Sequence, residues 1–138
     1  MTKEPQSELF GSGFFDEPAE TDPFQDSQKR MSERTKKDWT RIQAEVEESN
    51  AAFAAAMDAG LPATSSQAMR AAEQHRLHIQ RWFYDITPEL HRNLGERYVT
   101  DVGVMATYEN VRAGMAQYVR DAIHANADRA ALAAGQQS

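Results

Sequence analysis

The chain has 138 residues, of which 41% are hydrophobic and 26% are charged, a length and balance typical of one globular domain. Its net charge of −6 leaves no basic face for phosphates, so we expect no nucleic-acid partner for this chain alone. Cysteine is absent, which excludes disulfides and thiolate metal sites. The sequence also contains no membrane-length apolar run and no signal-peptide core, so we expect a cytoplasmic location and no membrane partner.

Residues 1–34 differ in composition from the rest of the chain. They hold three of the five prolines and many acids, yet also four phenylalanines: Phe10, Phe14, Phe15 and Phe24. A segment of this kind cannot build a core alone, so we predict a flexible segment whose phenylalanines dock on the domain or become ordered when a ligand binds. The alternative is a loosely packed or disordered tail.

Helical periodicity begins at Thr35 and predicts a helix to about residue 59. Thr35 can cap the free amides, with Asp38 three residues on in a capping-box position, and Gly60 and Pro62 stop the helix. Its apolar face repeats at spacings of three, four and seven. That face comprises Trp39, Ile42, Val46, Phe53 and Met57.

Four more helices are predicted in chain order. The second begins near Ser65 and ends before the Asp85–Pro88 break, and the third begins after the cap Thr87. A short helix follows Asp101, and the last covers roughly residues 112–132. Because no run alternates with period two, we predict an all-α domain of about five helices over residues 35–134, with a frayed tail at 135–138.

The sequence contains no constellation that indicates catalysis. No Gly-x-Ser-x-Gly elbow is present, and most Ser and Thr residues stand where helix capping explains them, so we expect no enzyme. His75 and His78 share a helix face, and Asp85 and His91 could complete a metal site. We favour a partly buried polar network of these histidines with Arg76 and predict no metal and no cofactor, because a metal needs three or four converging ligands.

Aromatic residues crowd the second half of the chain. Tyrosine has an apolar ring and a polar tip, which suits sites for amphipathic ligands, although each ring taken singly is more typical of a core. The methionines share this ambiguity, because Met fills irregular cores and also lines adaptable binding surfaces. The aromatic set comprises Trp82, Phe83, Tyr84, Tyr98, Tyr108 and Tyr118.

Three blocks of sequence carry a resemblance to a known family. They are AAEQHRLHIQRWFYD at 71–85, PELHRNLGERYVTD at 88–101 and GMAQYVRDAIHANA at 114–127. Their order and spacing resemble the TipAS family, an antibiotic-recognition domain found at the C-terminus of some MerR-type regulators and also as a free domain. The start of the chain is similar as well, with Leu9, Phe10, Gly11 and Phe14 followed by the helix at Thr35.

The resemblance implies a compact, globin-like helical fold with a deep cleft that binds bulky antibiotics, thiopeptides being the type ligands. It also implies that the N-terminal segment closes over the ligand, which makes Phe10, Phe14 and Phe15 the expected lid. The expected cleft residues are Trp82, Phe83, Tyr84, His91, Asn93, Leu94, Tyr98, Tyr108, Met115 and Tyr118.

Two departures from the family shape the expected mechanism. The family captures thiopeptides covalently through a cysteine, and the matching position is Asn93, while another family cysteine position is Ile86. We therefore expect reversible binding. No DNA-binding part or dimerising coiled coil precedes the domain, so we expect a monomer that sequesters the drug, or an excised sensor domain that reports it to a regulator.

Two alternatives remain at this stage. The domain could be a helical protein-interaction module that has lost drug binding, which the missing cysteine motivates. A weaker alternative is a globin-like haem site formed through His75, His78 or His91.

Overall fold

The computed structural model describes residues 23–137, which contain helices and no strand. The predicted all-α class is therefore confirmed over the part of the chain that the structure describes. The helices are α2 (Pro23–Ser32), α3 (Lys36–Asp58), α4 (Ser66–Trp82), α5 (Pro88–Thr100), α6 (Val102–Glu109) and α7 (Met115–Gln137).

Short polar side chains set the helix starts, as the sequence predicts. Thr35 accepts from the Asp38 amide while the Asp38 carboxylate accepts from the Thr35 amide, each at 3.1 Å. Thr87 caps α5 through a single bond, its hydroxyl accepting from the Leu90 amide. These contacts satisfy amides that the first turn of a helix leaves free.

Glycine ends α3 because the chain must enter the left-handed region there. Gly60 has φ of +74°, its amide donates to the Met57 carbonyl, and the Leu61 amide donates back to the Ala56 carbonyl. This pair of bonds is a Schellman motif, which a residue with a Cβ would strain.

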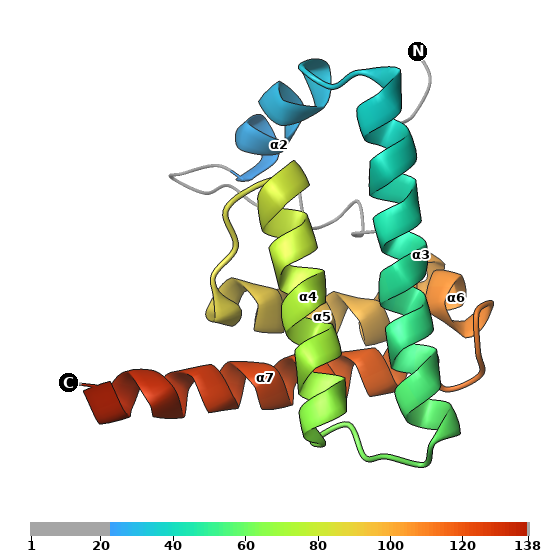
Figure 1. The fold of residues 1–138 in the computed structure, drawn as a ribbon, viewed down its shortest axis with the longest axis vertical. Helices are drawn as coiled ribbons and strands as arrows, with labels where there is room; N and C mark the ends of the chain where they lie inside the picture. Colours follow the sequence, from blue (N-terminus) through green and yellow to red (C-terminus); the bar gives the residue numbers. More distant parts are fainter. Residues whose placement is uncertain (1–22, 138) are drawn as a thin grey trace.

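The helices form two crossed layers. Helices α3 and α4 run side by side, and α5 and α7 lie across them (Figure 1). The most extensive packing joins α5 to α7, followed by α4 to α7. The core between the layers includes Phe53, Ile79, Leu94, Tyr98 and Ile123, all essentially inaccessible to solvent.

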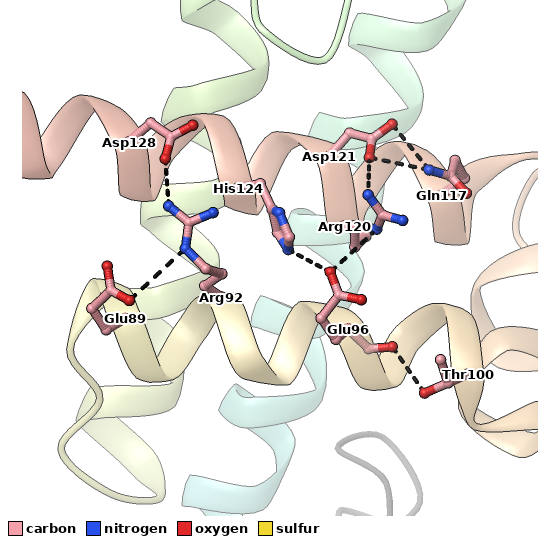
Figure 2. Close-up of polar contacts among 9 residues, drawn as sticks. All are labelled: Glu89, Arg92, Glu96, Thr100, Gln117, Arg120, Asp121, His124 and Asp128. Carbon is pink, nitrogen blue, oxygen red and sulfur yellow. Dashed lines mark hydrogen bonds and ion pairs between the residues drawn. The ribbon is translucent and has the colours of Figure 1, made fainter.

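Gly95 allows α5 to approach α7 closely. A Cβ placed on Gly95 would meet the Ile123 side chain at 3.5 Å, which is ordinary van der Waals contact with no room beyond it. The outer edge of this contact carries polar contacts, including Glu96 with His124 at 2.8 Å and the ion pair of Arg92 with Asp128 (Figure 2). Exposed pairs of this kind contribute little individually, so the α5–α7 contact rests mainly on the apolar side chains packed between the two helices.

Two boundaries differ from prediction. Residues 23–32 lie inside the predicted flexible segment but form α2, because Arg30 donates to the Gln80 carbonyl and pairs with Asp85 at 3.1 Å. These partners are fifty or more residues away, so local composition gave no sign of them. The last helix begins at Met115 and continues to Gln137, because the alanine-rich stretch 130–134 favours helix and Gly135 does not stop it.

The close contact at Gly95 predicts opposite effects for two substitutions. Gly95→Ala should leave the free energy of unfolding unchanged or raise it by up to ~1 kcal/mol, because alanine favours helix and its methyl just fits. Gly95→Leu should lower it by ~1–3 kcal/mol through overpacking against Ile123. Urea unfolding followed by circular dichroism measures both, and equal values for the two variants would contradict the contact.

Candidate functional site

Most of the predicted cleft residues are buried in the core. Of the ten, Asn93 is exposed on α5, and Trp82 and Tyr118 are half-buried. The lid residues Phe10, Phe14 and Phe15 lie outside the described residues. The seven buried members of the predicted set are Phe83, Tyr84, His91, Leu94, Tyr98, Tyr108 and Met115.

A polar centre lies inside this aromatic core. His75 of α4 and His91 of α5 share a hydrogen bond between Nδ1 and Nε2 at 2.9 Å, with the rings stacked. The other nitrogen of His75 lies 3.4 Å from the hydroxyls of both Tyr98 and Tyr108. The predicted polar network is thus confirmed for His75 and His91, with two tyrosines as further members. Its other predicted members bond elsewhere, Arg76 to Glu73 and the Ile86 carbonyl and His78 to Glu45.

Burial controls the charge of this centre. It holds the pKa of His75 well below its usual range, with the neighbouring imidazoles of His91 and His78 adding to the effect. It lowers the pKa of His91 to about 3. Burial also raises the pKa of Tyr98 well above its usual range. The centre is therefore neutral at physiological pH and acts through directional hydrogen bonds.

Tyr118 has a structural contact of its own. Its hydroxyl donates to the Leu61 carbonyl at 2.9 Å and lies 3.3 Å from the carbonyl of Pro62. The side chain therefore ties α7 to the loop between α3 and α4. Its role in the fold explains its position without a ligand.

A groove lies between α3 and α4, on the side of α4 that carries His78. It has a volume of about 350 Å³ and is polar at its mouth. A small cavity of about 20 Å³ lies further in, bounded also by α6 through Thr107 and Tyr108. Ser49 and His78 line both spaces and so form their shared wall. The groove is further lined by Arg41, Glu45, Glu48, Gln74, Leu77 and Arg81.

Glu45 organises the outer wall of this groove. One carboxylate oxygen lies 2.8 Å from His78 Nδ1 and accepts from the Trp82 indole at 3.0 Å. The other oxygen accepts from Arg81 at 3.0 Å. Burial opposes the charged carboxylate, but the bonds from His78 and Trp82 outweigh it and lower the pKa of Glu45. Glu45 is therefore an ionised hub that fixes the orientation of three side chains.

Three aromatic rings surround the guanidinium of Arg34, which lies just before α3. The guanidinium of Arg34 lies 5.2 Å from the centre of the Trp39 ring, 5.8 Å from that of Trp82 and 4.9 Å from that of Phe83. Cation–π attraction of this kind is strongest where water is excluded. Two of the predicted site residues thus have a cationic partner that the sequence analysis did not include.

The histidines of the described chain do not converge on one point. His75 binds His91 and His78 binds Glu45, so the two point to different partners. Within residues 23–137, no group of three or more His, Asp or Glu side chains could hold a metal ion. The cavity at His75 has room for about one water molecule, far less than a haem requires.

Sequence reasoning missed the groove itself. Glu45 and Ser49 lie four apart on α3, and both read as ordinary polar positions of a solvated helix face. The spacing of His75 and His78 was a signal, but it could not name their partners across the fold. Helix periodicity records which face is buried and not what the face is buried against.

None of the described helices is long and apolar enough to cross a bilayer. The fold and site together define a small helical domain with a neutral polar core and a polar groove, a class suited to binding.

Comparisons with known proteins give the family. The profile of the TipAS antibiotic-recognition domain matches residues 19–126. The HTH-type transcriptional activator TipA of Streptomyces coelicolor is 42% identical over 137 residues, covering 94% of this chain and 54% of that protein. The HTH-type transcriptional activator mta of Bacillus subtilis is 33% identical over 99 residues, covering 72% of this chain and 38% of that protein. The chain spans about half the length of the TipA relative that it matches.

Solved structures agree. TipAS from Streptomyces lividans in complex with nosiheptide superposes with a TM-score of 0.78 at 41% identity, covering 94% of this chain and 96% of that chain. The antibiotic-binding domain of a TipA-class multidrug resistance transcriptional regulator gives a TM-score of 0.61 at 49% identity, covering 66% and 97%. The chain belongs to the TipAS antibiotic-recognition domain family, as the three sequence blocks indicate.

The buried histidine pair predicts an acid-sensitive fold. The pKa of His91 is about 3 in the folded protein and ~6.5 in an unfolded chain. The unfolded chain therefore binds more protons between these values, and stability that is present above pH 6.5 is lost as the pH falls. Each such histidine should lower the free energy of unfolding by ~1.4 kcal/mol per pH unit below 6.5.

His91→Gln tests this assignment, since glutamine can hydrogen-bond to His75 but does not titrate. Urea unfolding between pH 7 and 5 should show a shallower pH dependence for this variant, by about one proton. Asn93→Ala, an exposed substitution on the same helix that leaves every histidine in place, is the control and should keep the wild-type slope. If the His91 variant has the wild-type slope, His91 does not carry the effect.

Proposed function

We propose that this domain binds bulky, amphipathic peptide antibiotics of the thiopeptide type, reversibly and without catalysis. The observation that carries the proposal is the match, over 94% of the chain, to TipAS in complex with the thiopeptide nosiheptide. The composition supports reversible binding, because no cysteine is present among the 138 residues to trap a ligand covalently. Binding then rests on apolar contact and hydrogen bonds.

The proposed ligand-contact surface comprises the ten residues predicted from the sequence, but these residues have different roles in binding. Asn93 is exposed and Trp82 is half-buried, so these two can meet a ligand directly. Buried members such as Tyr98 support the surface from beneath. Phe10, Phe14 and Phe15 keep their proposed role as a lid, which rests on their composition and on the family resemblance alone.

The biological outcome is proposed at the level of drug sequestration or drug sensing in the cytoplasm. The relatives are transcriptional activators of which the match covers 54% in TipA and 38% in mta, so a sensing role fits a domain that reports a ligand to a DNA-binding part. A pull-down without drug distinguishes this proposal from the alternative of a protein-interaction module. If the alternative holds, the pull-down should recover a stable protein partner that covers the α5 surface.

Nosiheptide titration tests the proposal directly. We expect saturable binding by calorimetry and, at a ligand concentration 100 times the dissociation constant, a stabilisation of about 2.7 kcal/mol. Mass spectrometry after denaturation should return the unmodified protein mass, because binding is reversible. An absence of both heat and thermal stabilisation across a panel of thiopeptides would contradict the proposed function.

The position of Asn93 yields a gain-of-function test. Because the family cysteine stands at the matching position, Asn93→Cys should convert reversible binding into covalent capture of a thiopeptide that contains dehydroalanine. The expected readout is a mass increase equal to the whole ligand that survives denaturation. Thr100→Cys, exposed on the same helix, is the control and should give no adduct at matched times. A variant at 93 that binds drug yet never forms an adduct would place the ligand elsewhere.

A further inference from the structure

Two buried polar atoms face the α3–α4 groove without a partner. Within residues 23–137, neither Nε2 of His78 nor Oγ of Ser49 makes a hydrogen bond. The His78 residue is only 6% exposed. Buried polar groups in folded proteins are almost always hydrogen-bonded, so two such atoms lining the same groove and cavity need an explanation.

The neighbouring carboxylate decides what His78 can accept or donate. Glu45 is ionised and can only accept, and it lies 2.8 Å from Nδ1 of His78. The proton of the neutral imidazole therefore sits on Nδ1, which leaves a lone pair on Nε2. Burial lowers the pKa of His78 and so favours this neutral form, although Glu45 opposes the shift. His78 thus presents a hydrogen-bond acceptor, and Ser49 adds a hydroxyl that can accept or donate.

The charges around the groove favour a neutral occupant. Arg41 and Arg81 stand at the mouth and disfavour a cation, while Glu48 disfavours an anion. Leu77, which is 42% exposed, supplies an apolar wall. The volume of about 350 Å³ falls within the range of ~300–1,000 Å³ that small-ligand pockets have.

The inner cavity is large enough to receive a small uncharged polar group of a ligand. Ser49 and His78 form the wall between groove and cavity. Glu45 holds His78 in place, so rotation of the Ser49 side chain alone would join the two spaces. The cavity of about 20 Å³ exceeds the ~10–15 Å³ that one water needs. It can hold a single hydroxyl or amide N–H at the end of a larger molecule, and a lone water is the competing occupant.

We infer that the α3–α4 groove is a ligand subsite in which an uncharged hydroxyl or amide N–H group donates to His78 Nε2 and contacts Ser49 Oγ. Identifying that group as part of a peptide-like drug rests on the proposed function. The subsite lies on α3 and α4, apart from the α5 surface that carries Asn93. It gives the domain a means to select for polar donors on an otherwise apolar ligand.

The test measures the ¹⁵N chemical shift of the His78 side chain and the affinity for nosiheptide. In ¹⁵N-labelled protein, the Nε2 resonance of His78 should move toward the value of a hydrogen-bonded nitrogen as nosiheptide is added. Ser49→Ala should bind nosiheptide about 2- to 10-fold more weakly, the range of one hydrogen bond. Ser49→Ala removes a hydroxyl that has no partner, so it should fold normally. Ser66→Ala, on the exposed first turn of α4, is the matched control and should keep wild-type affinity.

A small probe separates this inference from the proposed function. N-acetylthreonine amide is neutral and carries both hydroxyl and amide donors. At millimolar concentration it should shift the backbone amide resonances of Ser49 and residue 78, and His78→Phe should abolish this shift. If nosiheptide binds while Nε2 and the Ser49→Ala affinity do not change, the subsite is wrong and the proposed function stands. If nosiheptide fails to bind, a resonance shift caused by the small probe still supports the subsite, whereas the absence of that shift overturns it. An Nε2 that is hydrogen-bonded before any addition and unaffected by either compound shows a lone internal water and also overturns it.

Discussion

The hydrogen bond between His75 and His91 is the contact on which the remaining packing depends. Two imidazoles in a helical core are destabilising unless each finds a partner, and here they satisfy one another at 2.9 Å. Tyr98 and Tyr108 complete the arrangement from α5 and α6, and Phe53 of α3 lies edge-on against His75. Because hydrogen bonds are directional, this centre sets the register of three helices, α4, α5 and α6, where apolar packing alone would tolerate sliding.

This centre also changes the meaning of the aromatic residues. A cleft built from Tyr84, Tyr98 and Tyr108 was a reasonable expectation from the sequence, but all three are buried. The hollow space lies between α3 and α4, where Glu45 holds His78 and Trp82. Trp82 is therefore the residue that connects the predicted site with the observed groove. A ligand contacting Trp82 would act on the Glu45 hub and, through His78, on the inner cavity.

Local signals predicted a large part of the fold because their causes are local. The capping box of Thr35 and Asp38 and the stop at Gly60 involve neighbours in sequence, and the structure has both. The start of α7 is different. The Glu109 carboxylate accepts from the amides of Gly114 at 2.8 Å and Ala116 at 3.0 Å across a turn. Periodicity does not register such a contact, so it predicts a start near residue 112, three residues early.

The sequence by itself determined the helical class, most helix limits, the family and the absence of a cysteine, because periodicity, capping and composition are properties of the chain alone. Only the tertiary structure decided that His75 binds His91, that Arg30 anchors α2 to α4, and that Ser49 and His78 meet at one groove. Such contacts join residues 16 to 50 positions apart in the chain. A helix pattern states that a side chain is buried, and only the packing of whole helices selects its partner.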